Sequence, residues 1–191
     1  MNLGTLNVQD LVFAAAAGIA IAAACGLRAF LPLLALGIGV HFEWLQVAPG
    51  AAWIGSTPAL ITLAWATLIE LVADKVPALD HALDLVATGL RPLAAAVAAW
   101  CTFVGVHPAI AVAAALIMGT GAMGVHVAKA KVRLGSSMLT FGSANPVLSF
   151  FEDAIAIGLS ALAVLAPLAA LAGVGLLTWA LFRAFRPPAR S

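Results

Sequence analysis

The chain has 191 residues, of which 64% are hydrophobic and only 9% are charged, and its net charge is +1. Soluble domains are about 45–50% apolar and about 25% charged, so this composition excludes an ordinary soluble domain, and the charge gives no indication of a nucleic-acid partner. Continuous apolar runs at 11–27 and 154–182 exclude a transmembrane β-barrel, whose strands alternate apolar and polar residues. We therefore expect an all-α protein, a polytopic transmembrane helical bundle that forms a single domain over residues 1–191.

Six transmembrane spans are predicted, because a helix needs about 20 mostly apolar residues to cross a bilayer. The first span is interrupted by Gly26 and Pro32 around Arg28, which predicts a kinked or broken helix. The last two spans are separated near Pro167, and both fit only if the fifth begins near Pro146. The predicted spans are 11–40, 54–73, 92–107, 108–126, 147–166 and 168–185.

The positions of Lys and Arg set the expected orientation, because cytoplasmic loops collect these residues. Six spans with both termini in the cytoplasm place every Lys and Arg except Arg28 on the inner side, whereas five spans would export the basic tail 183–190. We therefore expect a multi-pass protein of the bacterial inner membrane whose tail contacts anionic membrane lipids. The residues on the inner side are Lys75, Arg91, Lys129, Lys131, Arg133, Arg183, Arg186 and Arg190.

The middle of the sequence contains a repeated spacing of polar residues. The interval of 16 positions from Lys75 to Arg91 recurs between Lys129 and Asn145. This spacing suggests two inward-facing helical hairpins related as parallel repeats, a plan found in some transporters. Two unrelated hairpins are the alternative. The expected repeats are 54–107 and 108–166.

Polar residues gather on helix faces toward the inner ends of the spans. Residues three or four positions apart share a helical face, so Glu70 and Asp74 form an acidic stripe and His126, Lys129 and Arg133 form a basic one. A charge at the bilayer centre costs about 2.5–3.5 kcal/mol or more, so such groups pair with one another, extend to the interface or line a polar cavity facing the cytoplasm. The candidate binding residues are Arg28, Glu70, Asp74, Lys75, Arg91, His126, Lys129, Arg133, Asn145, Ser149, Glu152 and Asp153.

Arg28 is the residue that most favours a functional site, because it lies deep in the first apolar stretch. An ionisable residue inside the membrane is by default a functional-site hypothesis. Its guanidinium suits an anionic or zwitterionic solute, whereas the carboxylates and His126 are suited to carrying protons. The structural alternative is an ion pair between Arg28 and one of the carboxylates, with Glu152 and Glu70 as candidates.

Two further motifs are less specific. Asp80 and Asp84 form a D-x-x-x-D pattern that can hold Mg²⁺ and a diphosphate in membrane prenyltransferases, although a solvated face of an amphipathic connector explains it more simply. Residues 119–124 match G-x-G-x-x-G, but no strand precedes them, so close helix packing through small residues is the better explanation. We predict no cofactor.

Three blocks of residues carry a resemblance to a known family. They are Gly26 to Leu34 (GLRAFLPLL), Glu70 to Pro92 with its aspartates and Thr88, and His126 to Asp153 with Lys129, Arg133, Ser143, Asn145, Pro146, Ser149 and Glu152. Together they resemble the bacterial and plastid membrane proteins grouped as domain of unknown function 4126, over most of the chain. The resemblance implies a multi-span membrane protein that shares these polar residues, and it implies no activity.

Three functions are open at this point. The first is a small channel or transporter for an ion or a small polar or anionic solute, with a polar intramembrane site that faces the cytoplasm. The second is a Mg²⁺-dependent membrane enzyme acting on lipid or isoprenoid diphosphate through Asp80 and Asp84. The third is a non-catalytic assembly or lipid-organising factor in which the charged stripes only clamp the hairpins together. We favour the first, in a chain short enough to form a homo-oligomer.

Overall fold

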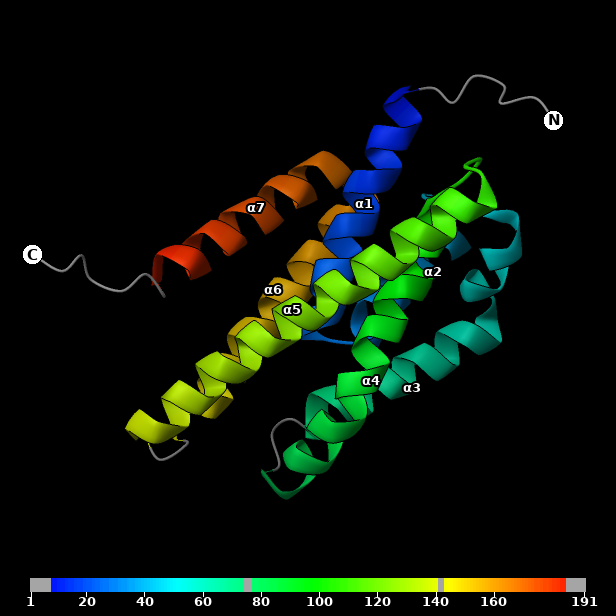
Figure 1. The fold of residues 1–191 in the computed structure, drawn as a ribbon. Coiled ribbons are helices and arrows are strands. Elements are labelled where there is room, and N and C mark those ends of the chain that lie inside the picture. The colour runs from blue at the N-terminus through cyan, green and yellow to red at the C-terminus, as the bar shows by residue number, and fades with distance from the viewer. Residues whose placement is uncertain (1–7, 74–76, 141–142, 185–191) are drawn as a thin grey trace, which may run out of the picture.

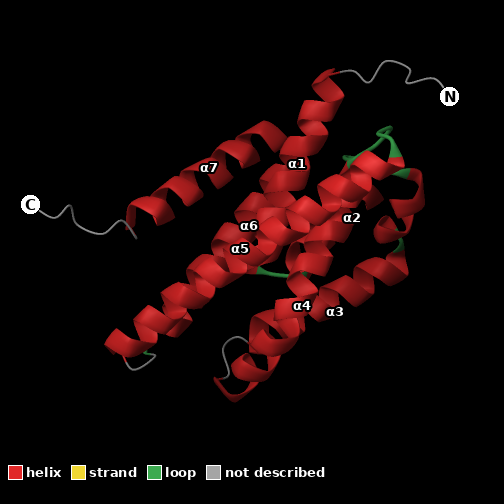
Figure 2. Cartoon of the chain, viewed as in Figure 1, coloured by secondary structure: helices red, strands yellow, loops and turns green. Residues whose placement is uncertain are grey.

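The computed structural model describes residues 8–73, 77–140 and 143–184, and every regular element among them is a helix, as Figure 2 shows. The all-α prediction is therefore confirmed. The helices are α1 (Val8–Leu27), α2 (Phe30–His41), the 3-10 helix η1 (Pro49–Gly55), α3 (Thr57–Ala73), α4 (Pro77–Thr102), α5 (Pro108–Thr140), α6 (Asn145–Leu165) and α7 (Pro167–Ala184).

Proline lies in the first turn of α4, α5, α6 and α7, where its missing N–H has no partner to lose and its fixed φ suits a helix. Between α4 and α5, Gly105 has a φ of +71°, a conformation that glycine adopts without steric cost. Two helices are longer than the predicted spans, since Pro92 lies inside α4 and α5 continues to Thr140. Much of the predicted connectors is therefore helical.

Helix α1 runs parallel to α5. Gly18 lies beside Met118, and Gly26 lies beside Ala122 and Val125, so residue numbers rise together along the two helices. A Cβ on Gly26 would come within 2.6 Å of the Ala122 carbonyl oxygen. Glycine at this position therefore allows the end of α1 to lie directly against the backbone of α5.

Helix α2 runs in the opposite direction to α1. Arg28, just before α2, contacts Asp153, and Gly39, near its end, contacts Val164, so α2 is parallel to α6. Because α5 and α6 form an antiparallel hairpin (Figure 1), α1 and α2 also fold back on each other. The break is where the sequence predicts it, but the prediction of one broken span over 11–40 is wrong, since the chain reverses direction there.

Val8 and Ala184, the first and last described residues, lie at opposite ends of the bundle (Figure 1). The first half of α1 lies beside the end of α4, where Gly18 meets Thr102. Helix α7 starts at this same end and runs back along α6, with Gly173 beside Leu159 (Figure 1). The reversal between α1 and α2 adds one more change of direction and so moves Val8 to the opposite end.

Small side chains bring the helices close together. Ala95, Ala98 and Ala122 are buried at the junction of α1, α4 and α5, and Gly119 places α5 against the Pro92 carbonyl of α4. The prediction of close helix packing in the G-x-G-x-x-G segment is thus confirmed at Gly119. Within the described residues, α5 and α6 are long and apolar enough to cross a membrane.

Replacement of Gly26 by alanine tests the close approach of α1 to α5. The added methyl meets backbone atoms, so we expect Gly26→Ala to lower the free energy of unfolding by about 1–3 kcal/mol. Gly124, on the same helix as the contacted residues, has nothing within 4 Å of an added Cβ, and Gly124→Ala should be neutral or stabilise by up to about 1 kcal/mol. Denaturant titration of the detergent-solubilised protein measures both, and equal effects would contradict the packing.

Candidate functional site

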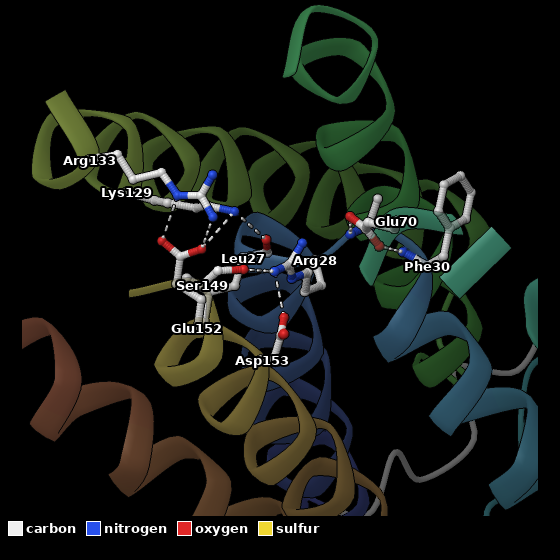
Figure 3. Close-up of polar contacts among 10 residues, drawn as sticks. Leu27, Arg28, Phe30, Glu70, Lys129, Arg133, Ser149, Glu152 and Asp153 are labelled. Atoms are coloured by element: carbon white, nitrogen blue, oxygen red, sulfur yellow. Dashed lines mark hydrogen bonds and ion pairs between the residues drawn. The ribbon is translucent and has the colours of Figure 1, made fainter. Parts of the chain in front are cut away.

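The reversal between α1 and α2 holds a fully buried arginine. Arg28 is 0% exposed, and its Nη2 lies 3.0 Å from the Ser149 hydroxyl and 2.5 Å from Asp153 Oδ1. Both partners lie on α6, one turn apart (Figure 3). Arg28 thus pairs with a carboxylate, as the structural alternative expects, but among the described acidic side chains the partner is Asp153 and not Glu152 or Glu70.

The two helix ends at this reversal are bound by side chains of opposite charge. The first N–H groups and the last C=O groups of a helix have no partner within the helix. Lys129 Nζ of α5 donates to the Leu27 carbonyl at the end of α1, at 3.3 Å. The Glu70 carboxylate of α3 accepts hydrogen bonds from the N–H groups of Ala29 at 2.7 Å and Phe30 at 3.1 Å. Each charge also matches the helix dipole, which favours cations at the C-terminus and anions at the N-terminus.

Glu152 joins the basic stripe of α5 to α6. Its two carboxylate oxygens accept from Nε and Nη2 of Arg133 at 3.2 and 2.9 Å, and Lys129 Nζ lies 3.0 Å from Oε2. A two-point contact between a guanidinium and a carboxylate is among the strongest side-chain hydrogen bonds. All three side chains are at most 13% exposed, so bulk water screens this contact little.

A second polar cluster joins α4 to α5. His126 Nδ1 is in hydrogen-bond contact with Nη1 of Arg91, and His126 Nε2 lies 3.3 Å from the Thr88 hydroxyl. Because arginine only donates, Nδ1 is the acceptor, and a neutral His126 then carries its proton on Nε2, toward Thr88. Arg91 and His126 are both buried.

Most of the predicted binding residues meet at the chain reversal, in a cluster that we call the break network. Its members are Arg28, Glu70, Lys129, Arg133, Ser149, Glu152 and Asp153. Arg91 and His126 form the separate α4–α5 cluster, and Asn145 Nδ2 donates instead to the Ser137 hydroxyl at 2.9 Å.

Four of the predicted residues lie wholly or partly outside the described structure. Asp74 and Lys75 fall between the described ranges, and Asp80 and Asp84 lie on α4 with side chains that are not described. In the described part of the chain, no group of three or more His, Cys, Asp or Glu residues is placed to hold a metal ion. The magnesium site at Asp80 and Asp84 therefore stays a prediction.

The main-chain groups of Leu27, Ala29 and Phe30 are the site members that the sequence analysis missed. The signal was present, because a break inside an apolar segment must leave unpaired carbonyl and N–H groups that need partners. Thr67 was also missed. It lies one turn before Glu70 on α3, is 6% exposed, and has no hydrogen-bond partner for its hydroxyl among the described residues.

The fold and the network define an all-helical protein with a buried, charged chain reversal. Residues 15–187 match the family described as "Domain of unknown function (DUF4126)", so the resemblance seen in the sequence is confirmed and the chain belongs to this family. No curated protein and no solved structure matches it.

Neutralising Glu70 should weaken the start of α2. A glutamine side chain keeps the shape but loses the charge and one of the two acceptor oxygens, so we expect Glu70→Gln to cost about 1–3 kcal/mol of stability. Glu43, which is exposed two residues after the end of α2, provides the control, and Glu43→Gln should stay within about 0.5 kcal/mol of the wild type. Equal unfolding midpoints for the two variants would show that Glu70 does not support the helix.

A double-mutant cycle separates true partners from neighbours. We expect Arg28→Gln and Asp153→Asn to show a coupling free energy of about 0.5–3 kcal/mol. The pair Glu70 and Lys129 should couple less, because the two side chains bind opposite sides of the break and form no ion pair with each other. Exchanging these two charges should therefore not restore stability, and restoration would contradict the assignment.

Proposed function

We propose that this protein is a multi-pass membrane protein that carries a small anionic solute across the bilayer, with the break network as its binding site. Membrane placement is supported by the apolar composition, by α5 and α6, and by large hydrophobic side chains that point outward on α3, α5 and α6. Trp44 and Trp53 are 59% and 55% exposed near the connection from α2 to α3, as suits residues at a membrane interface.

The proposed orientation follows the basic residues. Lys129, Lys131, Arg133 and Arg183 lie in the halves of α5 and α7 that are nearer the α5–α6 connection, while Arg91 lies close to the middle of α4. Positive charge marks the cytoplasmic side. In this proposal the chain enters from the outer side at α1 and leaves on the inner side at α7. This replaces the earlier expectation of two cytoplasmic termini, and the membrane itself stays the bacterial inner membrane.

The observation that carries the transport proposal is the chain reversal inside the bundle. Transporters commonly bind solutes where a membrane helix is interrupted, because the exposed N–H and C=O groups and the helix dipoles face the solute there. In this protein the reversal coincides with a fully buried Arg28. Buried ion pairs seldom stabilise a protein more than apolar residues of similar volume, so stability alone gives little reason to keep the Arg28–Asp153 pair.

The carboxylates of the network occupy positions that fit an anionic solute. Asp153 binds the Arg28 guanidinium, and Glu152 binds Lys129 and Arg133. In the proposed mechanism, protonation of one of these carboxylates weakens its hold on the cation, and the solute anion takes its place. The solute would then cross together with a proton, and the cation never loses an anionic partner.

A scaffold role is the second candidate, and the pairing itself favours it. Glu70, Glu152 and Asp153 each have partners on a different helix or at a helix end. A paired network of this kind holds α1, α2, α3, α5 and α6 together whether or not anything is transported. Wild-type protein without transport activity would favour this alternative.

Transport is tested with purified protein in liposomes that contain a pH-sensitive dye, with butyrate, chloride and phosphate as probes. We expect at least one probe to enter faster than in protein-free liposomes. Loss of a charge-assisted hydrogen bond costs about 1.5–3 kcal/mol, so Arg28→Gln should slow entry about tenfold or more. Lys131 is an exposed cation on the same helix as Lys129, and Lys131→Gln should retain wild-type flux.

Two results would contradict the proposal. One is wild-type protein that is folded in the liposomes and carries none of the three probes. The other is flux that is equally slow in Arg28→Gln and Lys131→Gln, because a cation outside the network would then matter as much as the buried one.

A further inference from the structure

A groove lies between α1, α5 and α7. Its volume is about 250 Å³. The lining is apolar, with Ile19 and Ala22 from α1, Ile117, Gly121 and Val125 from α5, and Val174 from α7. Ile117 is 72% exposed, so the groove faces the surroundings of the bundle and not its core.

The inner end of the groove leads to the break network. Val125 lines the groove and lies against Gly26. Lys129 follows Val125 by four residues, which places both side chains on one face of α5, and it binds the Leu27 carbonyl and Glu152. The groove ends at Val125, and Lys129 is the next side chain on this face of α5, one helical turn further on. From Ile117 to Lys129 this face of the helix is about 18 Å long, at about 1.5 Å per residue.

We propose that the groove holds the alkyl chain of a single-chain amphiphilic anion, a fatty acid in the simplest case, with its carboxylate at Lys129 and Arg133. The charge complementarity is direct, because Glu152 already places a carboxylate on both cations. In the proposed complex, the carboxylate of the ligand takes the position of the Glu152 carboxylate on these two cations. The inference rests on the proposed function in assigning the headgroup to that site, and it narrows the solute to a carboxylate that enters sideways from the membrane.

The size of the groove favours one chain. Sites for drug-sized ligands are typically about 300–1,000 Å³, and about 250 Å³ is smaller, so the groove has room for part of one alkyl chain while the rest of the chain stays in the lipid. Gly121 contributes to this space, because a Cβ on it would meet nothing within 4 Å. A large side chain at Gly121 therefore fills the groove without forcing helices apart.

Photolabelling tests this site. The wild-type protein in lipid nanodiscs is irradiated with palmitate that carries a diazirine near its methyl end, and the labelled residues are mapped by mass spectrometry. We expect labels at Ile19 and Ile117, at the outer end of the groove. Gly121→Phe should reduce labelling about tenfold or more, because the contacts of several buried methylenes are lost. Gly124 is equally open but does not line the groove, so Gly124→Phe should label as the wild type does.

The headgroup is tested with the methyl ester of the same probe. If Lys129 and Arg133 bind the carboxylate, the uncharged ester should label the groove much less than the acid. Equal labelling by acid and ester would overturn the anionic headgroup, and labelling outside the groove would overturn the site. If Gly121→Phe leaves labelling intact but changes the oligomeric state, the groove is instead a contact between copies of the chain.

Failure of the amphiphile site can be distinguished from failure of the proposed transport function. Groove labelling without flux of butyrate, chloride or phosphate would refute transport and leave the amphiphile site standing. Flux of butyrate that depends on Arg28, with no labelling of the groove by palmitate, would refute the amphiphile site and support transport of small anions.

Discussion

The carbonyl of Leu27 and the N–H groups of Ala29 and Phe30 must find partners inside an apolar bundle, and much of the arrangement follows from that requirement. Each unpaired main-chain group in such surroundings costs several kcal/mol. Lys129 reaches the carbonyl from α5, and Glu70 reaches the two N–H groups from α3. These two contacts fix where α3 and α5 lie relative to the reversal. They also explain why a chain with so few charges places them on different helices at the same depth.

The carboxylates of α6 neutralise the two cations that lie at the reversal, Lys129 and Arg28. Lys129 is buried and cannot stay unpaired, so Glu152 on α6 neutralises it and also binds Arg133. Arg28 lies at the turn itself, and Asp153 neutralises it from the adjacent face of α6. Two consecutive acidic residues point about 100° apart on a helix, which allows α6 to serve two separate cations. Removing one partner of the Arg28–Asp153 pair would leave a buried charge without its counter-charge, a change that typically costs about 3–5 kcal/mol.

The sequence was sufficient to predict helices, the position of the break and the polar faces, because hydrophobic runs and the 3.6-residue period are local properties. It did not predict that α1 and α2 reverse direction. A hydrophobic run has the same composition whether the chain continues or folds back, and only the contacts of Gly26 with α5 and of Gly39 with α6 decide between them. The partner of Arg28 was likewise beyond the sequence. Glu152 and Asp153 are neighbours in the chain, and which of them faces Arg28 depends on the rotation of α6.

The shape of each cation in the network suits the groups that it binds. Lysine carries a compact charge that can approach a lone carbonyl and one carboxylate oxygen together, as Lys129 does with Leu27 and Glu152, whereas the planar guanidinium of Arg133 matches both oxygens of Glu152. Because Lys129 is shared, the contact that holds the end of α1 and the contact that holds α6 are linked through one ammonium group. Anything that competes with Glu152 for Lys129 therefore also acts on the end of α1. In the proposed transport mechanism, this shared ammonium group is what would couple binding of the anion to the α1–α2 reversal.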